Sequence, residues 1–115
     1  MIDHALLRQL ADDVSLDDLR IIIDAFDTDM DRLCAVLRDA AQAGDSARCH
    51  RTAHAIAGSA GAVAARGLEQ IARAAMTGSP PPGTSLVDQA GAIAAAAAAA
   101  QAALAAFLRD GAQPA

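Results

Sequence analysis

The chain has 115 residues, a formal net charge of −5 at pH 7 and an apolar fraction of 54%. Its length suits one domain, residues 1–115, and is too short for a nucleotide-binding catalytic domain together with anything else. The negative charge argues against nonspecific binding to nucleic acid or to anionic membranes, because such binding needs a surplus of cations. Most apolar residues are alanines and only two are phenylalanines, so the core must consist of closely packed helices.

Five helical segments are expected in the chain, and the first two differ in length. Residues 3–10 form a short helix that caps the rest. A long helix starts at Ser15, where Asp18 completes a start similar to a capping box. Its apolar residues repeat at steps of three and four until Gly44, a residue type that suits a left-handed C-cap. This is the clearest amphipathic helix in the sequence.

The middle of the chain predicts two further helices. Asp45 is expected to be the N-cap of a third helix, and the very short turn before it requires the two flanking helices to run antiparallel. The apolar pattern resumes around Leu68 and stops at Gly78. The loop GSPPPGT follows, because consecutive prolines cannot continue a helix.

The last predicted helix starts at Thr84 or Ser85 and runs to Gly111, with residues 111–115 as a frayed tail. Its centre is a tract of alanines, which favour helix and allow close packing. Taken in order, these segments predict an all-α fold, an antiparallel four-helix bundle with a short additional N-terminal helix.

Two features bear on where the protein works. The tract AIAAAAAAAQAALAAF is the only candidate membrane segment, but alanine is weakly hydrophobic and Gln101 interrupts it, so no membrane span is expected. Cys34 and Cys49 lack a C-x-x-C spacing and are expected to be free thiols in a reducing compartment, with a disulfide or a metal pair as the alternative. With no signal peptide pattern at the N-terminus, the chain is expected in the cytoplasm, as a monomer.

The stretch AHAIAGSAGAV, residues 53–63, places one histidine beside two glycines, although glycine costs a helix about 1 kcal/mol relative to alanine. On a helical wheel, His54 falls roughly 160° from Ile56, which belongs to the core face. His54 is therefore predicted to be exposed. The same outward stripe contains Ala47, His50, Arg51, Ala57, Gly58 and Gly61. The glycines are interpreted as room for another molecule to approach the imidazole.

An exposed histidine in this setting is compatible with several roles. It can be a solvated surface residue with no function. His50 and His54, four residues apart on one face, resemble a pair of metal ligands, but no third ligand lies nearby in the sequence. A neutral imidazole can also attack phosphorus and carry a phosphoryl group. Arg51, one turn before His54, would then neutralise the added charge.

The residues His54–Gly61, HAIAGSAG, followed by Leu68 and Glu69, resemble the motif of histidine-containing phosphotransfer (HPt) domains, H-x-[LI]-K-G-[SA]-[SA]-x-x-x-[GA] with a downstream L-E. The resemblance extends from Ser15 to the final helix. It implies a four-helix bundle whose exposed histidine accepts a phosphoryl group from the aspartate of one receiver domain and passes it to another. His54 would be the phosphoacceptor, and Gly58 would clear space for the receiver.

One position departs from the family pattern. Family members usually have a lysine three residues after the histidine, where this chain has Ala57. Arg51 or Arg48 would have to substitute for that lysine. Glu69 corresponds to the downstream acid of the motif and is either functional or a surface charge paired with an arginine on its own helix, Arg66 or Arg73.

The resemblance implies a phosphoryl carrier of two-component signalling and not an enzyme, since no phosphate-binding loop for ATP is found. The expected partners are response-regulator receiver domains and a hybrid sensor kinase, with Mg²⁺ held by the receiver and no metal or cofactor in this chain. Two alternatives stay open. A non-transferring interaction module would bind receiver domains through the same face, and a metal-binding bundle would use His50 and His54.

Overall fold

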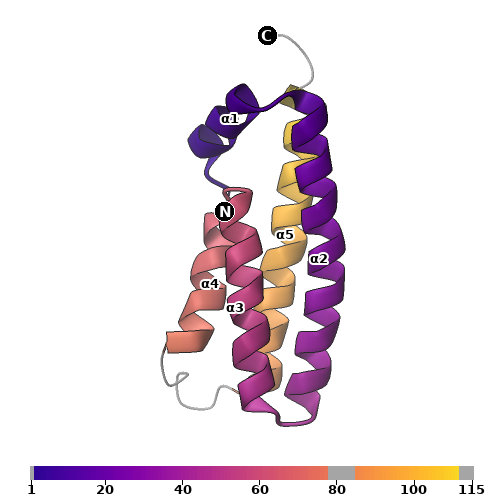
Figure 1. Ribbon diagram of the computed structural model, residues 1–115. Coiled ribbons are helices and arrows are strands. Elements are labelled where there is room, and N and C mark those ends of the chain that lie inside the picture. The colour runs from indigo at the N-terminus through magenta and orange to yellow at the C-terminus, as the bar shows by residue number, and fades with distance from the viewer. Residues whose placement is uncertain (1, 78–84, 112–115) are drawn as a thin grey trace.

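The computed structural model describes residues 2–77 and 85–111, which form five helices. They are α1 (His4–Asp13), α2 (Leu16–Gln42), α3 (Ser46–Ala62), α4 (Arg66–Thr77) and α5 (Leu86–Gly111). Helices α2 to α5 run antiparallel in a bundle, and α1 lies across one end of it (Figure 1). The predicted all-α fold, a four-helix bundle with a short N-terminal helix, is confirmed. The predicted loop GSPPPGT and most of the predicted tail lie outside the described residues.

Local side-chain chemistry fixes the starts of the helices. The side chains of Asp3, Ser15 and Asp45 each accept a hydrogen bond from the backbone N–H three residues later, at 3.1, 3.0 and 3.1 Å. Such N-caps satisfy donors that the first helical turn leaves unpaired. Gly44 has φ +70° in the turn between α2 and α3, a conformation that glycine adopts without strain. The predicted starts at Ser15 and Asp45 and the role of Gly44 are therefore correct.

The sequence did not predict the backbone conformation of the turn between α3 and α4. Ala64 adopts φ +60°, and the Ala65 N–H donates to the Ala60 carbonyl at 2.9 Å. The N-terminal segment covers this turn: the Asp3 N–H donates to the Ala64 carbonyl at 2.8 Å, and the Asp3 carboxylate contacts Arg66 Nε at 2.8 Å. These contacts tie the chain start to the beginning of α4.

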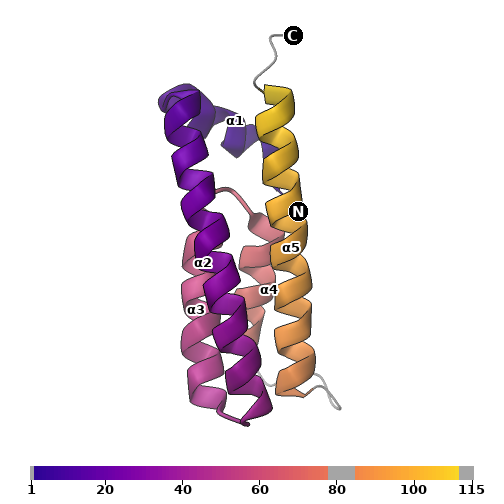
Figure 2. The ribbon, with the colours of Figure 1, turned by 90° about the vertical axis from the view of Figure 1, so that its right-hand side faces the viewer.

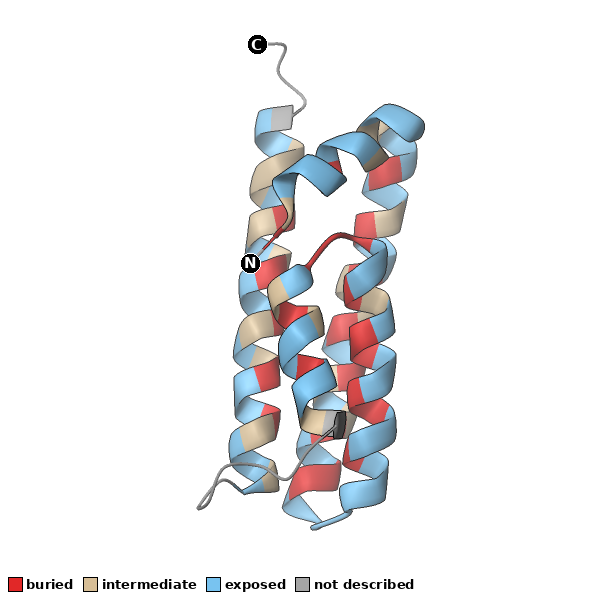
Figure 3. Ribbon diagram, turned by 90° about the vertical axis from the view of Figure 1, so that its left-hand side faces the viewer, coloured by how far each residue is buried: buried red, intermediate tan, exposed pale blue. Residues whose placement is uncertain are grey.

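The core runs the length of the bundle and is built from aliphatic residues of every helix (Figure 3). Its largest fully buried side chains are Leu7, Leu19, Ile23, Met30, Ile56, Val63, Leu68, Ile93 and Leu104. Helix α3 packs chiefly on α4 and α2, and α5 packs chiefly on α2 and α4. Figure 2 shows α2 and α5 side by side, with α3 and α4 behind them. Helix α3 keeps a broad face toward solvent, on which ten of its 17 residues are exposed.

Helix α5 combines high apolar content with a partly buried surface. By length and composition alone, the segment Leu86–Asp110 would suffice to cross a membrane, a property that alanine-rich helices in protein cores share. In the bundle, its buried side chains Ile93, Ala97 and Leu104 face the core. Cys49 is buried and Cys34 is half-buried, both are free thiols, and burial raises the pKa of each. The expectation of free cysteines agrees with this arrangement.

Candidate functional site

His54 lies at the middle of α3 and is exposed, as predicted from the helical wheel. The helix that carries it is well anchored. Asp45 caps its start, and the buried Thr52 donates its hydroxyl to the Arg48 carbonyl at 2.8 Å. Ile56, on the opposite side of the helix from His54, has no exposed surface. The imidazole is therefore displayed on a rigid support.

Most of the predicted outward stripe is exposed in the structure, but Ala57 is not. It retains only 1% of its surface. The wheel assumed one core direction for α3, whereas this helix contacts neighbours on two sides, α2 and α4. Ala57 falls on the α4 side and is covered there. The prediction that Ala57 points outward is wrong, and the position where the HPt motif has lysine lies at the contact between α3 and α4.

The two glycines that follow His54 have different surroundings. A Cβ atom at Gly58 would meet nothing within 4 Å. A Cβ atom at Gly61 would lie 3.3 Å from Oε2 of Glu69. The interpretation that both glycines leave room for another molecule therefore holds for Gly58 only. At Gly61 the room is occupied by a carboxylate of the same chain.

Glu69 connects this part of α3 to an arginine. Its Oε2 accepts from Nε of Arg73 at 3.1 Å and from Nη2 of Arg73 at 2.8 Å. Of the two pairings considered for Glu69, the one with Arg73 is present, and Arg66 pairs with Asp3 instead. The Glu69 side chain is 27% exposed and the Arg73 side chain 54% exposed. The sequence indicated the pairing of Glu69 with an arginine of its own helix. It did not indicate that the Glu69 carboxylate packs against Gly61, because that contact joins two helices.

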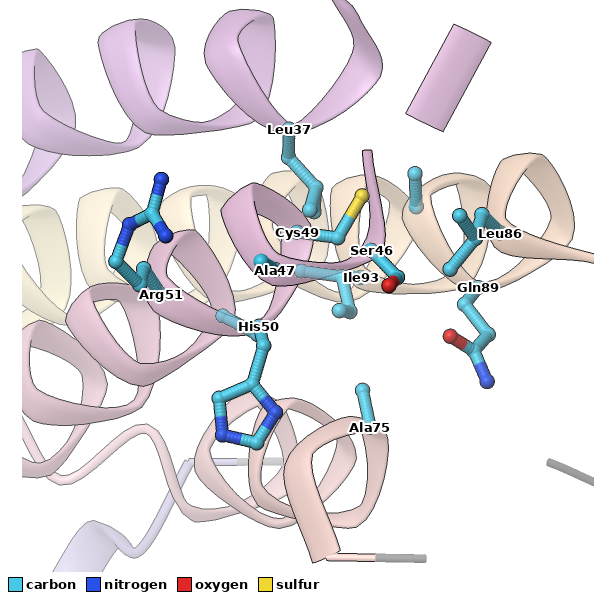
Figure 4. Close-up of a pocket in the computed structure, with 12 residues that line it drawn as sticks. Leu37, Ser46, Ala47, Cys49, His50, Arg51, Ala75, Leu86, Gln89 and Ile93 are labelled. Carbon is cyan, nitrogen blue, oxygen red and sulfur yellow. The ribbon is translucent and has the colours of Figure 1, made fainter. Parts of the chain in front are cut away.

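The side chains one turn before His54 diverge. In Figure 4, His50 points from α3 toward Ala75 of α4, whereas Arg51 extends on the side of α2. His50 and Arg51 also line a cavity of about 500 Å³ between α3, α4 and α5, which no sequence pattern indicated. Arg48, the other cation proposed to replace the missing lysine, is exposed, and its backbone N–H donates to the Asp45 cap. Of the two, Arg51 is the arginine nearer in sequence to His54.

The arrangement offers little to a metal ion. Within residues 2–77 and 85–111, no group of three or more His, Cys, Asp or Glu side chains is placed to hold one. His50 and His54 share a face of α3, but a structural zinc site needs four ligands and a catalytic one at least three. A nucleophile, a docking point and a surface residue without function are the other roles considered for His54.

Comparison with known proteins identifies the family. Residues 19–110 match the family model described as Hpt domain. Neither the curated proteins nor the solved structures that were searched include a match to the chain. Hpt domains are helical bundles that act as phosphocarriers in two-component signalling and are not themselves enzymes. The match spans the four helices of the bundle, the exposed histidine and the glycine that follows it, and on this ground the chain belongs to the Hpt domain family.

Proposed function

We propose that this protein is a histidine phosphotransfer protein of a phosphorelay, in which His54 accepts a phosphoryl group from the aspartate of one receiver domain and passes it to another. The observation that carries the proposal is an exposed imidazole on a rigid helix, with open space above Gly58 one turn later. Its partners would be receiver domains and a hybrid sensor kinase. We place it in the cytoplasm, as a monomer that binds neither nucleic acid nor membrane.

In the proposed reaction this chain contributes a nucleophile and its position. The unprotonated ring nitrogen of His54 attacks phosphorus, the N–P bond forms, the bond from phosphorus to the aspartyl oxygen breaks, and the carboxylate leaves with the electron pair. Such a transfer has a loose transition state that depends on in-line alignment and on neutralisation of charge. The receiver would supply Mg²⁺ and the acyl phosphate, and α3 would supply a nucleophile held in place. Transfer to a second receiver reverses these steps.

A second candidate function is an interaction module that binds receiver domains through the same face without transfer. The observation in its favour is Ala57, because the motif has lysine at this position and the alanine offers no charge. Docking would need the open surface at Gly58, but it would not need His54 to be nucleophilic.

The test is transfer from a receiver whose aspartate carries labelled phosphate. The wild-type chain is expected to take up label that is acid-labile and base-stable, as phosphohistidine is. His54→Gln should abolish uptake with the melting temperature nearly unchanged, because an exposed side chain contributes little packing. His50→Gln and His4→Gln, each at an exposed histidine, are matched controls and should keep full uptake. Binding of the receiver without uptake by the wild type would instead support the interaction module.

A further inference from the structure

We propose that Arg73 of α4 supplies the cation that faces the phosphoryl group on His54, and that Gly61 and Glu69 hold this arginine on the side of α4 that borders α3. The inference rests on the proposed function of His54 and adds a residue from a different helix to the site. Arg73 would take the role for which Arg51 and Arg48 are the candidates on α3. Its support comes from helix register, from side-chain direction and from the Glu69 contact.

The register of α3 against α4 follows from one contact. Glu69 lies against the Cα of Gly61, at the distance where a Cβ would touch its carboxylate. Because the helices are antiparallel, moving four residues forward from Glu69 to Arg73 corresponds to moving about four residues back along α3, to residue 57. Residue 57 is three residues from His54, which is about 4.5 Å along the helix axis. The backbone of Arg73 therefore lies within about one helical turn of His54 along the axis.

The directions of the side chains agree with this register. On the wheel of α4, Arg73 lies about 40° from Glu69, the residue that faces α3. On the wheel of α3, His54 lies about 20° from Gly61, the residue that faces Glu69. Both His54 and Arg73 are exposed. The two side chains therefore leave their helices on the same exposed side of the contact between α3 and α4.

The Glu69 contact explains how the arginine is kept on this side of α4. One carboxylate oxygen accepts from both Nε and Nη2 of Arg73, and the carboxylate rests where Gly61 has no side chain. A guanidinium carries several donors in a planar fork and can bridge two anions, here the carboxylate and a phosphoryl group. Arg51 approaches from the α2 side (Figure 4), so Arg73 provides the positive charge on the opposite side of His54.

The experiment compares Arg73→Ala and Arg73→Lys with Arg66→Ala. Arg66 is the matched control, because it lies on the same face of the same helix and its loss changes the net charge equally. By the same register it sits level with residue 64, about 15 Å along the axis from His54. Each variant is assayed in single-turnover transfer from a phosphorylated receiver at several receiver concentrations. Loading with phosphoramidate, which needs no protein partner, and thermal unfolding are measured alongside.

Arg73→Ala is expected to lower the maximal transfer rate about 5- to 30-fold, with little change in the half-saturating receiver concentration. Arg73→Lys should recover most of that rate, and Arg66→Ala should transfer as the wild type does. The assignment of Arg73 would be overturned if Arg73→Ala kept the wild-type maximal transfer rate. This includes the case in which the variant changes only the half-saturating receiver concentration. A wild-type chain that gains no phosphohistidine from either donor would overturn the proposed function and this inference together.

Discussion

Substitutions at Gly58 are expected to affect the stability of α3 and the proposed phosphotransfer in opposite directions. Gly58 lies in the interior of the helix, and a Cβ atom added there meets nothing within 4 Å. Gly58→Ala therefore gains helix propensity, about 1 kcal/mol, with no steric penalty to offset it. For a domain of this size that free energy corresponds to a rise of about 4 °C in the melting temperature. The same reasoning predicts that Gly58→Leu is tolerated by the fold, because its side chain would project into open space.

Function should respond in the opposite direction. A leucine at residue 58 would stand one turn from His54, on the surface that a receiver must approach, and we expect it to slow transfer at least tenfold. Gly91 provides the matched control, because it is also an exposed helical glycine with nothing within 4 Å of an added Cβ. It lies on α5. Gly91→Ala and Gly91→Leu should show the same stability effects and leave transfer unchanged.

The assays are urea denaturation for the free energy of unfolding and single-turnover transfer from a phosphorylated receiver. Two results would refute the reasoning about Gly58. One is wild-type transfer by Gly58→Leu, which would mean that the open space is not used by the partner. The other is a stability gain in Gly91→Ala that Gly58→Ala does not share, which would mean that Gly58 is needed by the fold.

Three further variants test single contacts. Gly61→Ala should be stabilised less than Gly58→Ala in urea, because its Cβ would lie 3.3 Å from Oε2 of Glu69 and displace the carboxylate; an equal gain would contradict this contact. Burial raises the pKa of Asp27, whose Oδ1 is buried with no hydrogen-bond partner among the described residues. Its charged form therefore destabilises the fold above the ordinary pKa of 3.8, and Asp27→Asn should raise the melting temperature by about 1 to 3 °C at pH 7. That gain should shrink at pH 3.5, and the same gain at both pH values would count against the explanation. Ala57→Lys should lower the melting temperature, because Ala57 keeps only 1% of its surface at the contact between α3 and α4 and a longer side chain would overpack it; an unchanged melting temperature would contradict this placement of Ala57.

The helices were predictable because their signals are local. Ser15 and Asp45 bond to backbone atoms three residues away, and Gly44 takes a conformation that its own chemistry permits. The end of α1 was predicted at residue 10, three residues before its end at Asp13. Ala64 adopts φ +60°, a conformation for which an alanine gives no signal in a sequence.

The site was predictable in part, for a related reason. His54 and Gly58 were placed outward correctly because the face of α3 opposite Ile56 is open to solvent. Ala57 was misplaced, and the room at Gly61 was assigned to a partner, because both positions are decided by α4 and not by α3 itself. A wheel of one helix shows its apolar face, but it does not show which neighbouring helix covers the flanks of that face. The contact of the Glu69 carboxylate with Gly61, and the position of Arg73 that follows from it, are known only from the structure.

The most direct test of the account is the location of the phosphoryl group after reaction with a phosphorylated receiver. The chain would be digested under neutral or basic conditions, which preserve phosphohistidine, and the modified peptide sequenced by mass spectrometry with a fragmentation method that keeps the N–P bond. The account predicts one phosphoryl group per chain, on His54. A phosphoryl group on His50 or His4, or a receiver that binds the chain and transfers nothing, would contradict it.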